Sequence, residues 1–138
     1  MRNLFRFSVW QSILVIGAAA LVIFLGARPA FSAPPQVPPV PVVNAGLGPC
    51  SADFTVKDGE NKPIYGATIS VNFRYGFLNL HKESLEAYTN PDGKARFEGF
   101  PNYVKNNLAF RLHYRGRQKT VLDDPSVTCQ AVEPVILP

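Results

Sequence analysis

The sequence predicts an all-β domain, a seven-stranded antiparallel Greek-key β-sandwich that follows an N-terminal hydrophobic helix. Three observations support this fold class. Beyond residue 49, apolar and polar residues alternate in short segments, which is the period of a strand with one buried face. Turn-forming clusters separate these segments at intervals of roughly 8–12 residues, a spacing typical of sandwiches. No segment of this part has a helical apolar pattern longer than about one turn.

The first 32 residues have the layout of a secretory signal peptide or a membrane anchor. Arg2 and Arg6 form a basic start, and residues 13–27 contain no charged or strongly polar side chain. The small residues that follow favour cleavage after Ser32. The alternative is an uncleaved helix in which residues 7–27 tether the chain to a membrane, since about 20 apolar residues are enough to span one. In both cases we expect the rest of the chain to be exported, to the periplasm, the cell surface or the medium.

Residues 33–49 are predicted to form a proline-rich spacer. Five of the eight residues from 34 to 41 are proline. Because proline fixes φ and has no N–H to donate, this stretch cannot be a helix or a central strand. We expect an extended polyproline II conformation that holds the following domain away from a membrane or a partner.

Residues 50–138 are predicted to form the sandwich. The clearest strand has Ala67, Ile69 and Val71 on one face and small polar residues on the other. The sequence Asn90-Pro91-Asp92-Gly93 predicts a tight turn, because an Asp-Gly pair tolerates the positive φ that hairpin turns require. The predicted strands cover residues 51–57, 64–73, 85–89, 94–98, 108–114, 118–122 and 127–137.

The two cysteines are predicted to form a disulfide. Cys50 precedes the first predicted strand and Cys129 opens the last one, and an even cysteine count in an exported protein suggests a bridge. Closing a loop of this length stabilises a fold by about 4 kcal/mol in the chain-entropy model. Nothing near either thiol in the sequence supplies further ligands, so we expect neither a metal site nor a catalytic cysteine.

Three sequence elements in order resemble the carboxypeptidase regulatory-like domain, a member of the transthyretin-like class of sandwiches. They are FTVKD at residues 54–58, KPIYGATI at residues 62–69, and YTNPDGKARF at residues 88–97 with GFP at residues 99–101. The similarity covers about residues 51–122. It implies a sandwich fold and an accessory role in exported proteins, with the motif residues serving the structure and none of them catalytic.

The charge of the chain argues against a nucleic-acid partner. Three of the fourteen Lys and Arg residues lie in the leader, at Arg2, Arg6 and Arg28, which leaves eleven against ten Asp and Glu. Binding to nucleic acid through counterion release needs a clustered basic face. The one candidate cluster is Arg111, Arg115, Arg117 and Lys119, and alternation along two short strands is expected to scatter these side chains over both faces. We therefore expect no nucleic-acid partner.

The residues needed for the enzymes of related folds are missing from the sequence. Transthyretin-like hydroxyisourate hydrolases end in Tyr-Arg-Gly-Ser or a near variant, whereas Tyr114-Arg115-Gly116-Arg117 lies far from the C-terminus. Intradiol dioxygenases need two tyrosines and two histidines on iron, and His81 and His113 are the only histidines here. The prediction is a domain that is not an enzyme, with no catalytic residue, no metal and no cofactor.

A surplus of aromatic residues suggests a binding surface. Tyr75, Phe77, Phe100 and Tyr103 fall in or beside predicted connections, close to Asn79, Asn102, Asn106 and Asn107. Such aromatic side chains can form a protein hot spot or a platform for sugars. The predicted function is a non-catalytic accessory module that makes protein–protein contacts in the cell envelope or outside the cell. The alternative is a carbohydrate-binding module at the cell wall or on extracellular polysaccharide.

Overall fold

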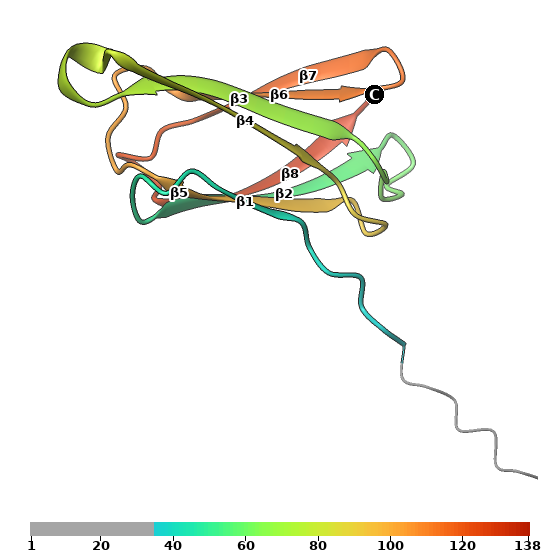
Figure 1. Cartoon of the computed structure of the whole chain (residues 1–138). Helices are drawn as coiled ribbons and strands as arrows, with labels where there is room; N and C mark the ends of the chain where they lie inside the picture. Colours follow the sequence, from blue (N-terminus) through green and yellow to red (C-terminus); the bar gives the residue numbers. More distant parts are fainter. Residues whose placement is uncertain (1–34) are drawn as a thin grey trace, which may run out of the picture. The chain divides into compact units, whose positions relative to one another are not determined.

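The computed structural model describes residues 35–138, which fold into two stacked sheets of four strands each (Figure 1). The predicted signal peptide or anchor, its hydrophobic helix and the cut after Ser32 lie outside the described residues. Among residues 35–138 no helix is long and apolar enough to cross a membrane. The strands are β1 (Val42–Asn44), β2 (Cys50–Asp58), β3 (Thr68–Tyr75), β4 (His81–Tyr88), β5 (Lys94–Phe100), β6 (Leu108–Tyr114), β7 (Arg117–Asp123) and β8 (Gln130–Leu137).

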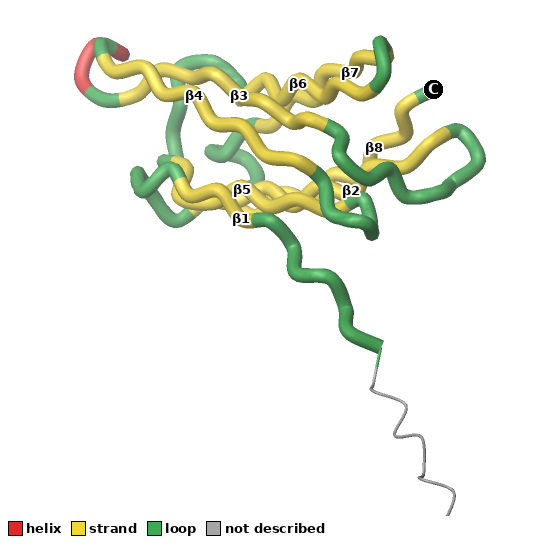
Figure 2. The backbone as a smooth tube through the Cα atoms, turned by 45° about the vertical axis from the view of Figure 1, so that its right-hand side comes forward, coloured by secondary structure: helices red, strands yellow, loops and turns green. Residues whose placement is uncertain are grey.

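The two sheets confirm the all-β sandwich but differ from the prediction in strand number and direction. One sheet has the order β1-β5-β2-β8 and the other has the order β4-β3-β6-β7. Figures 1 and 2 show them as two layers facing each other. The structure has eight strands where seven were predicted. It is not wholly antiparallel either, since β1 runs parallel to β5 and β8 runs parallel to β2.

The eighth strand, β1, comes from the predicted spacer. Residues 42–48 contain no proline, so each has an N–H donor, and residues 42–44 pair with the edge of the first sheet. The amide of Arg96 donates to Pro41 O at 2.9 Å, and the amide of Ala45 donates to Glu98 O at 2.8 Å. The side chain of Asn90 donates to the carbonyls of Pro38 and Pro39. The folded unit therefore begins at residue 37, well before the predicted boundary at residue 50.

A cluster of phenylalanines fills the space between the sheets. Phe54 and Phe97 come from the first sheet and pack against Phe110 from the second. The centroid of the Phe110 ring lies 4.7 Å from that of Phe54 and 5.5 Å from that of Phe97. All three side chains are fully buried, and inward-facing Ile, Val, Leu and Ala residues surround them. This core accounts for the alternation in β2, β3, β5 and β6, because one face of each of these strands is buried in it.

The predicted disulfide is present and joins the start of β2 to the residue before β8. Cys50 and Cys129 are 79 residues apart in the sequence. The amide of Ser51 also donates to Cys129 O at 2.8 Å, so the bridge lies where these two parallel strands begin. A structural disulfide indicates an extracellular or otherwise oxidising compartment.

Candidate binding site at the β3–β4 hairpin

The β3–β4 hairpin ends in a short turn with unusual backbone angles. Gly76 has φ 79° and ψ −170°, a region that essentially only glycine occupies. A Cβ at this position would lie 2.9 Å from the ring of His81. Leu78 and Asn79 follow in the left-handed region, with φ 56° and 53°. Asn tolerates that conformation, but Leu does so at a cost, since its Cβ crowds the following carbonyl.

This strained turn exposes a group of large apolar side chains. Phe77, Leu78 and Leu80 project from it, and we call these three residues the hairpin tip. Phe77 is 82% exposed. Figure 1 shows the turn at the left end of the layer formed by β3 and β4, and Figure 2 marks its short helical segment in red. Because a strained backbone that presents apolar side chains to water is costly for folding, it points to a role outside folding.

The four predicted surface aromatics divide into different environments. Phe77 and Tyr103 are exposed, and Tyr103 lies on the connection between β5 and β6. Tyr75 is half-buried, with its ring stacked on that of His81 at 5.4 Å between centroids. Tyr75 therefore supports the base of the hairpin turn and presents only part of its ring to solvent.

The fourth predicted surface residue, Phe100, is part of the core, which corrects the prediction. It is 1% exposed, and its ring lies 5.4 Å from that of Phe73. The cause is a β-bulge, because the pairing of β5 with β2 shifts register between Glu98 and Phe100. Gly99, at φ 78°, is the extra residue. The bulge reverses the alternation, so Phe97 and Phe100 both point inward.

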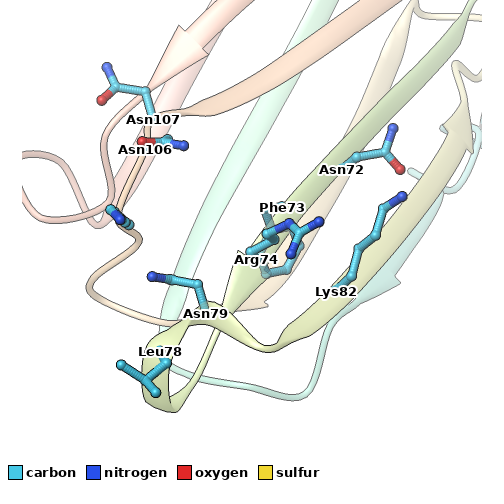
Figure 3. A pocket seen from close by; sticks show the side chains of 9 residues that line it. Asn72, Phe73, Arg74, Leu78, Asn79, Lys82, Asn106 and Asn107 are labelled. Carbon is cyan, nitrogen blue, oxygen red and sulfur yellow. The ribbon is translucent and has the colours of Figure 1, made fainter.

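A polar groove of about 700 Å³ lies beside the hairpin tip (Figure 3). Its walls come from β3, from β4 and its turn, and from the connection that leads into β6. The residues that line it are Asn72, Phe73, Arg74, Leu78, Asn79, Lys82, Lys105, Asn106 and Asn107.

The basic residues of this groove were missed from the sequence. Arg74 and Lys82 are opposite each other only because β4 begins at His81, four residues earlier than predicted. The sequence signal that could have revealed these basic residues is Gly76. A turn at this glycine would have predicted a β-hairpin in which positions 74 and 82 lie opposite each other. Tyr103 does not line the groove, although Lys105, on the same connection between β5 and β6, does so.

The two histidines lie at opposite ends of β3 and cannot share a metal ion. His81 pairs with Tyr75, and His113, on β6, pairs with Thr68. Seven residues of β3 separate the two pairs, which corresponds to about 23 Å. Residues 35–138 contain no group of three or more His, Cys, Asp or Glu side chains that could hold a metal ion. The two histidines therefore do not fit the iron site of an intradiol dioxygenase.

One carboxyl group in the described part of the chain is buried, that of Asp123 at the end of β7. Burial raises the pKa of Asp123 above its usual value, and the charges of Glu133 and Asp124 raise it further. Asp123 lies opposite Leu108, an apolar core residue, in the strand pair β6–β7. We therefore attribute no chemistry to it.

Comparison with known proteins gives weak structural similarity and no family. No protein-family model matches the chain, and no curated protein matches it. Among solved structures, catechol 1,2-dioxygenase from Pseudomonas arvilla C-1 is similar with a TM-score of 0.49 and 12% identity, over 75% of this chain and 59% of that one. Hydroxyquinol 1,2-dioxygenase from Pseudomonas putida DLL-E4 is similar with a TM-score of 0.47 and 12% identity, over 75% and 63%. The chain thus spans about three fifths of the length of these enzymes.

These similarities correct the prediction that the chain is not an enzyme. The similar solved structures named above are enzymes, so the prediction that this chain is not an enzyme is withdrawn. At 12% identity the likeness concerns the fold alone, and it transfers no activity to this chain.

Proposed function

We propose that this chain is an exported accessory module that binds a protein partner in the cell envelope or outside the cell. The observation that carries the proposal is the hairpin tip, three large apolar side chains exposed together on a strained turn. Burying a Leu or Phe side chain against a partner contributes about 1.5–3 kcal/mol. Aromatic and apolar anchors of this kind dominate most protein interfaces. Tyr103, exposed on the connection between β5 and β6, is a further candidate contact.

The proposal also covers the export of the domain and the family to which it is related. The disulfide supports export, with residues 1–32 as a cleaved signal peptide or a membrane tether. We also propose that the domain is related to carboxypeptidase regulatory-like domains and has the Greek-key connectivity of that class. The turn at residues 90–93 supports the family relation. There Gly93 has φ 71°, and a Cβ would lie 2.3 Å from Val56 O, so this family glycine has a structural reason.

A second candidate function is carbohydrate binding, and the polar groove favours it. Four asparagines line that groove, and carboxamide groups match the paired donor and acceptor character of sugar hydroxyls. The groove lies beside the hairpin tip, so the two candidate functions use adjacent surfaces that mutation can separate.

The proposal is tested by capture from an envelope extract. Residues 33–138, oxidised, are immobilised and exposed to extract from the source cell, with soluble polysaccharide as competitor. We expect one or two proteins at a defined ratio, unaffected by polysaccharide and lost when the tip is made polar by Phe77→Ser and Leu80→Ser. The matched control is Val132→Ser with Ile136→Ser, which removes two exposed apolar side chains from β8. Equal capture by all three proteins, or loss of capture with polysaccharide alone, would refute the protein-binding proposal.

A further inference from the structure

We propose that the polar groove binds an acidic polysaccharide, a chain of sugars that carry carboxylate groups. This inference rests on the carbohydrate-binding candidate above and adds the charge of the ligand. It also assigns the recognition to Arg74, Lys82 and Lys105, together with the asparagines of the groove.

The first observation is a concentration of positive charge that folding does not explain. Arg74 and Lys82 face each other directly across the β3–β4 pair, and Lys105 joins them from the connection before β6. Like charges opposite each other destabilise a strand pair. Within residues 35–138 none of these three cations takes part in a salt bridge, and no carboxylate lines the groove. We infer that an anion from outside the chain pairs with these three cations.

The second observation is that the asparagines of the groove are free to bind. None of the four makes a side-chain hydrogen bond within the described part of the protein. By contrast, the side chains of Asn44 and Asn90 bond to Glu98 and to the carbonyls of Pro38 and Pro39. Each free carboxamide offers two donors and one acceptor, which suits a hydroxyl group that is itself donor and acceptor. The free residues are Asn72, Asn79, Asn106 and Asn107.

The third observation is the shortage of apolar surface in the groove, which distinguishes sugars from other anions. Leu78 is its one exposed apolar side chain, because Phe73 is buried in the core. A protein segment needs apolar or aromatic anchors in desolvated pockets. The bases of a nucleic acid need aromatic faces on which to stack. A carboxylated sugar chain needs neither, and its carboxylates and hydroxyls correspond to the cations and carboxamides that are present.

The experiment measures binding of the full chain, purified in a sugar-free non-ionic detergent, to three polymers. Polygalacturonate supplies carboxylated sugars, dextran supplies neutral sugars, and polyglutamate supplies carboxylates without sugars. We expect binding to polygalacturonate that weakens as salt is added, with at least about tenfold weaker binding to the other two. Arg74→Gln combined with Lys105→Gln should weaken binding to polygalacturonate about tenfold or more. The matched control is Lys94→Gln, which removes an exposed cation from β5 in the other sheet.

Each outcome decides the proposal. Equal binding to polyglutamate would overturn it and indicate a site for an acidic protein segment. Equal binding to dextran would overturn the role of charge but leave the carbohydrate-binding candidate standing. Binding to none of the polymers would overturn both, while the capture of a protein partner through the hairpin tip would be unaffected. The Asn106→Ala/Asn107→Ala variant should lose polygalacturonate and keep its thermal unfolding midpoint, because neither side chain bonds within the fold.

Discussion

Replacing both bridged cysteines, Cys50→Ala with Cys129→Ala, is expected to lower the free energy of unfolding by about 4 kcal/mol. The bridge closes a loop that contains β2 to β7, with a sequence separation of 79 between the two cysteines. Without it the unfolded chain gains the entropy of an open loop of that length. A domain of this size has a total stability of about 5–15 kcal/mol, so the loss is a large fraction of it.

The measurement is denaturant unfolding of the variant, with the reduced wild-type protein as an independent control. Both should show the same loss, since both remove the same covalent link. The pairing of β2 with β8 should persist in the folded variant, because eight register pairs hold these strands together without the bridge. A variant as stable as the oxidised wild type would contradict the structural role assigned to the disulfide.

Phe100→Ala is expected to lower the free energy of unfolding by about 3–5 kcal/mol, the usual cost of deleting a buried phenylalanine ring. Its ring lies 5.4 Å from Phe73 and 5.8 Å from Phe110, so its removal leaves a cavity where the two sheets meet. Phe77→Ala, the same chemical change at the hairpin tip, should alter stability by less than about 0.5 kcal/mol, since that side chain is exposed.

Urea unfolding of the two variants distinguishes a core aromatic from a surface aromatic. Its midpoint and slope give the free energy of unfolding of each variant. If Phe100→Ala left the free energy of unfolding unchanged, Phe100 would not be buried by the bulge at Gly99. It would then again be a candidate for the binding surface. If Phe77→Ala were as costly as Phe100→Ala, the hairpin tip would be part of the fold rather than a free surface.

Local sequence patterns predict a strand well where apolar and polar residues alternate without interruption, and a turn well where the turn-forming residues are adjacent. The alternation of Ala67, Ile69 and Val71 identified the inward face of β3 and of the residue before it, and all three are buried. The turn at residues 90–93 formed where the Asp-Gly pair predicted it, with the amide of Gly93 donating to Asn90 O, but it joins β4 of one sheet to β5 of the other and does not close a hairpin. The cysteine pairing followed from the even count alone.

The remaining features depend on tertiary pairing that no local pattern encodes. The two valines of β1 favour a strand, but a three-residue segment is too short to be recognised from the sequence, and it pairs with the free edge of β5. The burial of Phe100 depends on a bulge, which reverses the parity that sequence alternation assumes. The groove depends on the register that brings Arg74 opposite Lys82, so its charges could not be grouped until the hairpin was placed.

The central claim is that the hairpin tip is the surface that contacts a protein partner, and photo-crosslinking in the source cell tests it most directly. A photo-reactive phenylalanine analogue replaces Phe77 or, as the control, Tyr65, which is exposed on a different connection. We expect one discrete adduct of defined mass from position 77 and none from position 65. No adduct from position 77, or the same adducts from both positions, would contradict the proposal.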